Sequence, residues 1–320
     1  MPLGTFISVG RSLDSAVRRV RRAEELGYDS VFTTHLAGFD SLTVLAAYAG
    51  ATERVRLGTG VLPMYSRSPA ATAQQAATVD AIAAGRLVLG IGVSHKVTVE
   101  NWFGSEIGKP VREMREYVGV LRAIFAGEEP PQDNERFRTQ FRFMGPAVRP
   151  DLPIYVAGLS PGMLRLAGEV GDGVVLWLCN PDYIRDVVIP EVTTGRERAG
   201  KPLEGFDVVA AVPSAVTDDP EAARARLRGE LVTYFSLPFY RKMLERSGFG
   251  DDIERFDAKM AGATPRAPPP RSPTASSASS PPSAPRRRRR RPCSATSTPA
   301  SPRPASAGSR GQTSRRRWRR

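Results

Sequence analysis

Short apolar runs of strand length alternate with longer segments of helical period along the first 260 residues. Apolar residues three and four positions apart indicate an amphipathic helix, whereas a short uninterrupted apolar run is typical of a buried strand. Strands that alternate with helices favour parallel βαβ units. The predicted strands are seven: 5–9, 30–33, 55–61, 87–91, 154–157, 174–178 and 208–216.

The segments between these strands carry helix start and stop signals. Serine is a good cap and proline suits the first helical turn, so Ser68-Pro69 is expected to open a helix that runs to Gly85. The first predicted helix can be capped by Ser12 or Asp14 and stops at Gly27. Its apolar face is Val17, Val20, Ala23 and Leu26. Further helices are expected at 42–51, 111–125, 161–170, 183–199 and from residue 220.

Seven strands are one fewer than a closed (β/α)8 barrel requires. The missing unit is due after residue 260, but residues 261–320 contain no Lys, Asp, Glu, Val, Ile, Leu, Met, Phe or Tyr. This segment carries 15 arginines and 12 of the chain's 28 prolines, so it has almost nothing to bury and its charges repel one another. We therefore predict one domain at 1–260 and a disordered Arg/Pro/Ser/Ala-rich tail at 261–320.

The tail has two interpretations. Its abrupt start, at the point where a barrel strand is due, favours a GC-rich coding sequence read in a shifted frame, which leaves the barrel without its last βα unit. A genuine tail would instead bind nucleic acid non-specifically through its arginines. The chain's net charge is +13, and the 15 tail arginines leave −2 for residues 1–260. The basic character therefore belongs to the tail alone.

Composition also limits the compartment and the chemistry. The two cysteines, Cys179 and Cys293, form neither a disulfide framework nor a zinc pattern, and no His-rich spacing suggests a metal. No signal peptide and no apolar run of membrane-spanning length are visible. We expect a cytoplasmic protein that does not contact a membrane and has no metal site.

Four motifs in order along the chain each join a strand to a helix through glycine. A glycine at such a joint lets the backbone turn or approach a ligand closely. The motifs are 23–31 followed by His35; 57–61 followed by Ser68-Pro69; Val79-Asp80 leading into 85–92; and 154–158 followed by 167–168 and 171–173. Together they resemble the luciferase-like monooxygenase family, and within it the branch that uses the deazaflavin coenzyme F(420).

This resemblance implies a (β/α)8 TIM barrel with its site on the loops at the carboxyl ends of the strands. It also implies a homodimer, a small organic substrate and a cofactor ring over the barrel mouth. In the deazaflavin-dependent members a non-proline cis peptide backs the ring, and Gly60-Val61 is the matching pair here. The expected reaction is hydride transfer between coenzyme F(420) and the substrate.

His35 and His95 are the candidate catalytic residues. Histidine is suited to proton transfer because its ordinary pKa lies near the operating pH. The family often has an acidic residue before the first histidine, but Thr34 stands there, so a carboxylate that would orient the His35 ring is missing at that position. His95 follows the fourth predicted strand, and Glu100, Trp102 and Phe103 come later in the same loop, where they either cover the ring or simply pack.

The turn after the fifth predicted strand is the expected phosphate site, because free N–H groups and the positive end of a helix dipole suit an anion. Both coenzyme F(420) and FMN carry a phosphate, so this turn does not choose between them. The expected cofactor-binding residues are Thr34, Gly60, Val61, Gly92, Val93, Ser94, Gly158, Leu159, Ser160, Gly162 and Met163.

The sequence leaves two other functions open. One is an FMN-dependent luciferase-like monooxygenase that uses molecular oxygen. The other is a barrel that binds a ligand without catalysis, or an inactive product, because the barrel lacks a unit. Gly90-Ile91-Gly92-Val93-Ser94-His95 lacks the third glycine of a dinucleotide fingerprint, and no phosphate-loop lysine or nucleophile-elbow serine is present.

Overall fold

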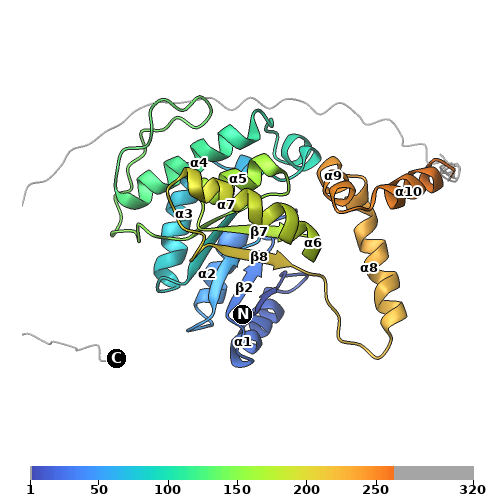
Figure 1. The fold of residues 1–320 in the computed structure, drawn as a ribbon. Helices are drawn as coiled ribbons and strands as arrows, with labels where there is room; N and C mark the ends of the chain where they lie inside the picture. The colour runs from blue at the N-terminus through green and yellow to red at the C-terminus, as the bar shows by residue number, and fades with distance from the viewer. Residues whose placement is uncertain (1, 263–320) are drawn as a thin grey trace, which may run out of the picture. The chain divides into compact units, whose positions relative to one another are not determined.

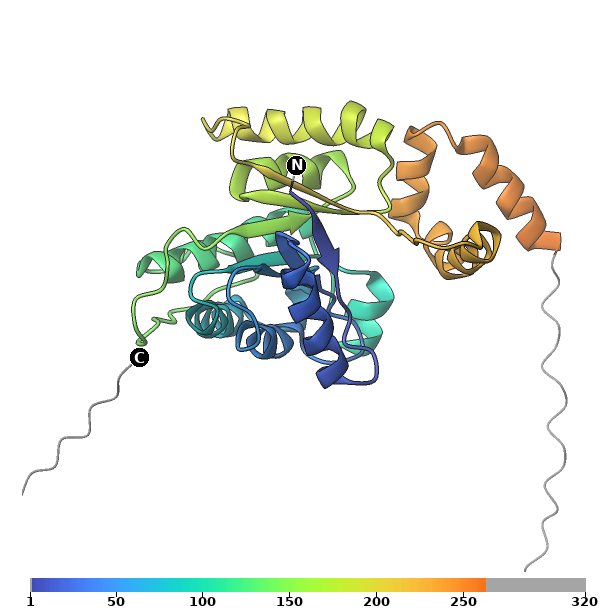
Figure 2. The same ribbon diagram turned by 90° about the horizontal axis from the view of Figure 1, so that it is seen from below.

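The computed structural model describes residues 2–262 of the chain. The predictions made for the Arg-rich tail, its disorder and its possible contact with nucleic acid, lie outside the described residues. In the described part, one curled sheet of parallel strands is covered by helices on its outer face (Figures 1 and 2). The α/β architecture predicted from the alternating pattern is therefore confirmed.

All strand pairs in the sheet are parallel, and the order of the main path is β1-β2-β3-β5-β6-β7-β8. Each predicted strand therefore has a counterpart. The strands are β1 (Gly4–Phe6), β2 (Ser30–Thr33), β3 (Arg56–Thr59), β4 (Leu62–Pro63), β5 (Leu87–Gly92), β6 (Ile154–Ala157), β7 (Gly173–Trp177) and β8 (Asp207–Ala211). We call the edge of the sheet where these strands end the carboxyl edge, and the opposite edge the amino edge.

The strand predicted at 55–61 is two short strands. β3 pairs with β2 and with the start of β5, whereas β4 pairs with the end of β5 through Leu62 and Ile91. Between them the Gly60-Val61 peptide bond is cis, as the resemblance implied. The prediction of a continuous third strand was wrong because the chain leaves the ladder at this bond and rejoins it one residue later.

The sheet curls far enough to bring distant strands into contact across its interior. Three strands separate β3 from β8 in the sheet order, yet Arg56 Nη1 lies 3.1 Å from Asp207 Oδ2. The Tyr155 hydroxyl of β6 donates a hydrogen bond to the same carboxylate. Within residues 2–262, β1 pairs only with β2 and β8 only with β7, so the barrel is open between β1 and β8.

The helices begin where the sequence provides caps. Ser12, Ser68 and Asp219 each accept a hydrogen bond from a backbone N–H in the first turn of the helix that follows. The helices are α1 (Leu13–Glu25), α2 (Ser41–Ala49), α3 (Pro69–Ile82), α4 (Pro110–Ala126), α5 (Pro161–Val170), α6 (Pro181–Tyr183), α7 (Ile189–Arg198), α8 (Pro220–Phe235), α9 (Pro238–Arg246) and α10 (Gly250–Gly262), with a short 3-10 helix η1 (Met64–Ser66) and π-helices η2 (Thr98–Trp102) and η3 (Ile184–Val188).

Two apolar clusters lie on the two faces of the sheet. The larger one fills the space between strands and outer helices and contains the fully buried Tyr48, Tyr117 and Tyr183. The smaller one fills the barrel interior with Phe32, Val88, Tyr155 and Val175. Leu26, which was predicted on the apolar face of α1, is instead 60% exposed, because the helix has already ended at this residue.

The last helices α8, α9 and α10 form an arm beside the strands (Figure 1). The strand predicted to run to residue 216 ends at Ala211, since Pro213 has no N–H for the ladder and the chain then turns toward α8. The arm reaches the barrel through side chains such as Met243, whose sulfur lies 3.6 Å from Cys179 Sγ, and Tyr240. No residue of α8 itself is buried.

Candidate functional site

The carboxyl edge of the sheet carries a cavity of about 400 Å³ beside the end of β2. Pockets in barrel enzymes form on the loops that follow the strands, and this volume lies within the range of small-molecule sites. Loop residues after β2 make one wall and the end of η2 makes the other. The cavity is lined by His35, Leu36, Ala37, Gly38, Asp40, Arg67, Trp102 and Phe103.

His35 is held in this cavity by one of its two ring nitrogens. The backbone N–H of Ser41 donates to Nδ1 at 3.3 Å, and the Ser41 hydroxyl lies 3.0 Å from the same atom. Since Nδ1 accepts from a backbone N–H, the neutral ring carries its hydrogen on Nε2. Among residues 2–262, Nε2 has no hydrogen-bond partner and it is not sealed from solvent. The Nε2–H of His35 is therefore available to donate a hydrogen bond to a ligand.

A carboxylate does accompany His35, but it comes from a different position than expected. Asp40 Oδ2 lies 3.7 Å from Nδ1 of His35. The sequence predicted no orienting carboxylate at position 34, and the loop after β2 instead brings Asp40 near the ring, without a hydrogen bond between the two side chains. Thr34 instead places its hydroxyl 3.2 Å from that of Ser8.

Asp40 is shared between three neighbours, which fixes its charge. It caps α2 by accepting from Thr43 N–H at 2.8 Å, and its other oxygen accepts from Arg67 Nη2 at 2.6 Å. Burial alone would raise the pKa of the Asp40 carboxyl, but the hydrogen bonds from Arg67 and Thr43 hold it below its ordinary value. Asp40 is therefore ionised and neutralises the guanidinium of Arg67.

The pKa of His35 is lowered from its ordinary value of 6.5. Burial is the main cause, because it disfavours the charged ring, and the nearby Arg67 cation acts in the same direction. Asp40 partly opposes both. The imidazole is consequently neutral at pH 7.

The segment that carries Arg67 is anchored by two tyrosines. The Tyr117 hydroxyl of α4 donates to the Arg67 carbonyl at 3.3 Å, and that hydroxyl lies 2.5 Å from Thr72 Oγ1. The Tyr65 hydroxyl donates to the buried carboxylate of Glu113 at 2.5 Å. Rigid second-layer contacts of this kind hold a polar side chain in one position.

His95 lies apart from His35. Its ring is 6.0 Å from the ring of Tyr240 on α9, in an aromatic group that also contains Tyr234 and Trp177. Burial lowers the pKa of His95. One strand separates β2 from β5 in the sheet order, so the structure places the two histidines over different parts of the carboxyl edge.

The predicted residues around the cis bond pack against one another. A Cβ added to Gly92 would lie 2.6 Å from Val61 Cγ2, so glycine is required for β5 to approach this point of the chain. Gly60 packs in the same way against the ring of Phe6. Val93 and Ser94 follow, half-buried, and Ser94 has a φ of +68°, a conformation that non-glycine residues adopt mainly at special positions.

The first turn of α5 presents free backbone donors. Ser160 occupies the cap position, but its hydroxyl makes no capping hydrogen bond, in contrast to Ser12 and Ser68. Among the described residues, the N–H groups of Gly162 and Met163 have no hydrogen-bond acceptor. The nearest atom to a Cβ built on Gly162 is 3.9 Å away.

The other residues of this turn support its shape. The Leu159 carbonyl accepts a 2.6 Å hydrogen bond from the Tyr183 hydroxyl, and the buried Met163 side chain packs against Gly158. Unpaired N–H groups at a helix N-terminus fit a phosphate. The turn predicted from sequence therefore fits the phosphate of either cofactor.

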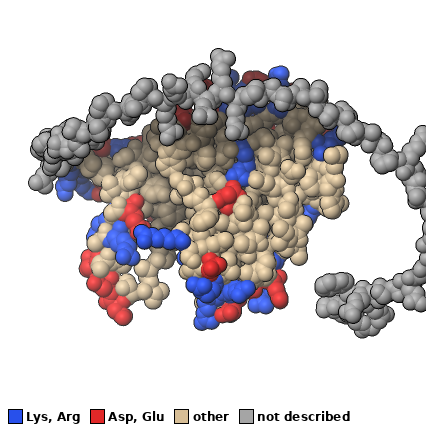
Figure 3. Space-filling model, turned by 180° about the vertical axis from the view of Figure 1, so that it is seen from behind, with Lys and Arg blue, Asp and Glu red and all other residues tan. Residues whose placement is uncertain are grey.

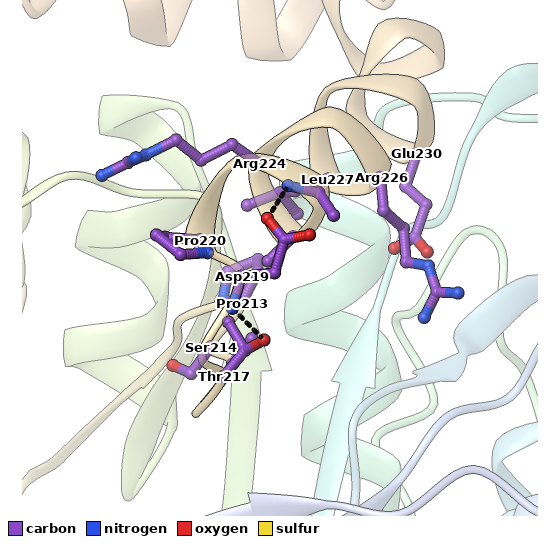
Figure 4. Close-up of a pocket in the computed structure, with 12 residues that line it drawn as sticks. Pro213, Ser214, Thr217, Asp219, Pro220, Arg224, Arg226, Leu227 and Glu230 are labelled. Atoms are coloured by element: carbon purple, nitrogen blue, oxygen red, sulfur yellow. Dashed lines mark hydrogen bonds between the residues drawn. The ribbon is translucent and has the colours of Figure 1, made fainter.

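A larger hollow of about 810 Å³ lies elsewhere, between α8 and the loop before it (Figure 4). Two of the four charged residues that line it are paired locally: Asp219 caps α8 by accepting from Ala222 N–H at 3.0 Å, and Arg224 pairs with Glu221 at 2.6 Å. It contains neither a histidine nor a buried polar group. The chemistry therefore favours the smaller cavity.

Charged side chains of both signs lie side by side on the face opposite to the view of Figure 1, without a broad patch of one sign (Figure 3). Within residues 2–262, no group of three or more His, Cys, Asp or Glu side chains is arranged to hold a metal ion. None of the described helices is long and apolar enough to cross a membrane.

Sequence reasoning missed Asp40, Ser41 and Arg67. The signal for Asp40 and Ser41 was present, since both immediately precede the helix predicted from residue 42 and aspartate is a good cap. Arg67 gave no local signal, because its contact with Asp40 joins two different βα loops.

The sequence pattern of the luciferase-like monooxygenase family matches residues 1–278. The chain belongs to this family. Its membership accounts for the parallel strands and for the position of the cavity on the carboxyl edge.

Two curated relatives are similar over most of the described region. A protein of Mycobacterium tuberculosis named as a coenzyme F(420)-dependent oxidoreductase is 33% identical over 230 residues, which are 67% of this chain and 66% of that protein. A 5,10-methylenetetrahydromethanopterin reductase of Archaeoglobus fulgidus is 35% identical over 237 residues, 73% of this chain and 69% of that protein. The chain thus spans about two thirds of the length of these relatives.

Solved structures show the same fold. The coenzyme F(420)-dependent tetrahydromethanopterin reductase of Methanopyrus kandleri superposes with a TM-score of 0.71 at 23% identity, covering 82% of this chain and 80% of that one. The monooxygenase RslO1 of Streptomyces bottropensis superposes with a TM-score of 0.61 at 24% identity, covering 82% of each chain. The luciferase-like TIM-barrel architecture predicted from the motifs is confirmed.

Proposed function

We propose that the protein is an oxidoreductase that uses the deazaflavin coenzyme F(420) and acts on a small organic substrate at the carboxyl edge of its open barrel. The two curated relatives named above, one a coenzyme F(420)-dependent oxidoreductase and one a 5,10-methylenetetrahydromethanopterin reductase, support this proposal. When bound, the deazaflavin would give or take a hydride.

One observation carries the proposal. The free Nε2–H of His35 and the uncapped N-terminus of α5 lie on the same carboxyl edge, after β2 and β6 respectively. Three strand spacings, about 14 Å, separate these strands. Such a span suits an elongated ligand whose reactive ring and phosphate lie at different points of its length.

The chain's own residues would have separate tasks. Gly162 and Met163 would hold the phosphate through their backbone N–H groups, helped by the α5 dipole. The chain around Gly60 and Val61 would support the ring. His35 would donate its Nε2–H to the oxygen of the substrate, and the aromatic side chains of the cavity would exclude water from that hydrogen bond.

The proposal is tested by titrating the full-length chain with oxidised coenzyme F(420) and, in parallel, with FMN, followed by fluorescence. We expect saturable micromolar binding of coenzyme F(420). Binding of FMN alone would support the monooxygenase function instead. Binding of neither cofactor to a folded sample would overturn the enzyme proposal and leave a barrel without cofactor.

Two matched variants locate the phosphate. Gly162→Asp adds a negative charge to the first turn of α5, where space is open, and Gly162→Asn adds the same volume without the charge. We expect the first to raise the Kd for coenzyme F(420) by about tenfold or more and the second by about threefold or less. Equal effects of the two variants would contradict a phosphate at this turn.

A homodimer and a cytoplasmic location stay predictions.

A further inference from the structure

The barrel has an open seam, which consists of the unpaired edges of β1 (Gly4–Phe6) and β8 (Asp207–Ala211). Within residues 2–262, β1 pairs only with β2 and β8 pairs only with β7. An unpaired strand edge presents a row of backbone N–H and C=O groups with which another strand can pair. The open seam brings two such edges of one sheet to the same side of the barrel.

On β1, alternate residues direct their backbone groups toward the seam. The Leu3 carbonyl accepts a hydrogen bond at 2.9 Å from the residue before β2, and the Ile7 N–H donates one to β2 at 2.8 Å. Successive residues of a strand direct their N–H and C=O groups to opposite sides. The backbone groups of Gly4 and Phe6 therefore point toward the seam.

On β8 the same alternation holds. The Asp207 N–H donates to the Asp172 carbonyl, just before β7, at 3.1 Å. The backbone groups of Val208 and Ala210 therefore point away from β7 and toward the seam. Ala210 is exposed, in agreement with an edge that nothing in residues 2–262 covers.

The curvature of the sheet leaves one strand's place at the seam. In eight-stranded barrels, interior side chains from alternate strands meet in one layer. Along the main path β3, β6 and β8 are the third, fifth and seventh strands, and their side chains Arg56, Tyr155 and Asp207 meet in the interior. The third and seventh strands lie opposite one another in a ring of eight. The eighth place of that ring is the seam.

The side chains beside the seam are apolar on both faces of the sheet. On the inner face, Phe6 and Val209 pack half-buried against the interior cluster. On the outer face, Ile7 belongs to the larger cluster and Val208 packs against it. Parallel strands that are covered on both faces are nearly continuous runs of Val, Ile and Leu. A strand that fits the seam is therefore apolar on both of its faces.

The chain itself offers no such strand for the seam. Each strand within residues 2–262 is already part of the sheet. The sequence of residues 263–320 contains no Val, Ile, Leu, Met, Phe or Tyr, and of the residues most frequent in strands it has only Thr and one Trp. A second copy fits poorly, because its strands already pair within its own sheet. The chemistry of the seam thus favours a segment of a different polypeptide.

We propose that the open seam binds an extended segment of another polypeptide, which adds to the sheet as a parallel strand between β8 and β1. The segment is about five residues long, like β8, rich in Val, Ile and Leu and free of proline. Its backbone pairs with Val208 and Ala210 on one side and with Gly4 and Phe6 on the other. Binding at the seam is independent of the proposed cofactor site.

A fluorescein-labelled peptide of residues 173–177, preceded by a pair of lysines for solubility, is the probe. This β7 sequence is apolar and already forms a parallel ladder with β8 in the structure. By fluorescence anisotropy we expect saturable binding to the full-length chain with a Kd of about 100 µM or less. The same peptide with Val175→Pro lacks its central N–H and should bind at least about tenfold more weakly. No binding, or equal binding of the two peptides, would overturn the proposal.

Two alanine-to-proline variants of the full-length chain locate the peptide. Ala210→Pro removes an N–H that points toward the seam, and proline is tolerated at such a strand edge. Ala215→Pro is the control, since Ala215 is an exposed residue of the loop after β8. We expect Ala210→Pro to raise the Kd for the peptide by about tenfold or more and Ala215→Pro to leave it within about twofold. The same change in both variants would overturn the proposal.

Amide hydrogen exchange of the unchanged chain locates the peptide without any substitution. We expect slower exchange at residues 4–7 and 207–211 in the presence of the peptide and unchanged exchange at residues 213–230. Protection at residues 213–230 with none at the seam would overturn the proposal.

Sedimentation velocity distinguishes the peptide from a second copy as the occupant of the seam. We expect the unchanged chain and Ala210→Pro to have the same molar mass in the absence of peptide, because the seam is then free. A larger species that disappears in Ala210→Pro would show that a second copy covers the seam, and it would overturn the proposal.

Discussion

The two edges of the same sheet differ in the polar groups that they leave available to a ligand. At the amino edge most polar groups pair with one another: the Glu24 carboxylate accepts from the N–H groups of Arg54 and Val55, and the two Nη atoms of Arg86 donate to the carbonyls of Ala49, Thr52 and Val55. Arg86 Nε is buried without a partner among the described residues, where no ligand can reach it. At the carboxyl edge, Nε2–H of His35 and the first N–H groups of α5 have no partner among the described residues.

This difference assigns stability to one edge and binding to the other. A buried polar group that is fully paired stabilises the fold, whereas an unpaired donor in a cavity adds little until a ligand supplies an acceptor. Substitutions at the amino edge should therefore lower the free energy of unfolding without affecting cofactor binding. Substitutions at the carboxyl edge should weaken cofactor binding without lowering the free energy of unfolding.

The largest expected effect is on stability at the amino edge. Asp80, buried at the end of α3, accepts from Leu87 N–H at 3.2 Å and from Arg149 Nη2 at 3.0 Å. Asp80→Ala leaves both donors without this acceptor and should lower the free energy of unfolding by about 3 kcal/mol. Urea denaturation measures this loss, and the exposed Asp151→Ala is the control. A loss below about 1 kcal/mol, or weaker coenzyme F(420) binding by the folded fraction, would break the comparison.

The next effect is on catalysis at the carboxyl edge. His35→Asn removes the Nε2–H donor but keeps a side chain that can accept from Ser41 N–H. Turnover with coenzyme F(420) should fall by about 100-fold or more, whereas the free energy of unfolding should change by about 1 kcal/mol or less. Steady-state kinetics and urea denaturation on the same samples separate the two. Turnover above half of the original would show that His35 is not part of the chemistry.

A smaller effect concerns the titration of His35. Its pKa is below 6.5 because of burial and Arg67, so Arg67→Gln should raise it and Asp40→Asn should lower it further. NMR of the imidazole signals can follow this, since the chain has only two histidines. Because the folded-state pKa is lowered, His35 supports stability above pH 6.5, and this support is lost as pH falls through the folded-state pKa. Shifts of the same sign in the two variants would contradict the geometry of the three groups.

The smallest effect is expected at the hollow beside α8. Arg226→Gln and Glu230→Gln change residues that line it on a helix without buried residues. The free energy of unfolding should change by about 0.5 kcal/mol or less and the Kd for coenzyme F(420) by less than about twofold. Urea denaturation of both variants measures the free energy of unfolding, and isothermal titration with coenzyme F(420) measures the Kd. A large loss of cofactor affinity would move the site from the carboxyl edge to this hollow.

Local sequence signals predicted the elements well where each element depends on its own residues. Apolar runs located each strand, and Ser68-Pro69 and Gly85 marked the start and the end of the α3 region. The break between β3 and β4 was not visible in the sequence, because the apolar residues Val61 and Leu62 follow the cis bond directly and continue the strand pattern.

The candidate site was predictable only in part, for a physical reason. His35 and the α5 turn follow a strand directly, and the carboxyl edge of a parallel sheet is where such residues meet. The electroneutral pair of Asp40 and Arg67 depends on a contact between residues 27 positions apart in two loops. The sequence around Asp40 does not reveal that Arg67 neutralises its charge, and the sequence around Arg67 does not reveal Asp40.

The comparison of the two edges is tested most directly by amide hydrogen exchange of the folded chain with and without oxidised coenzyme F(420). We expect slower exchange in the presence of the cofactor at residues 35–42, 60–64, 93–103 and 158–164, and unchanged exchange at the amino edge around residues 53–56 and 86–87. Protection at the amino edge or at residues 213–230, with none at the carboxyl edge, would contradict it.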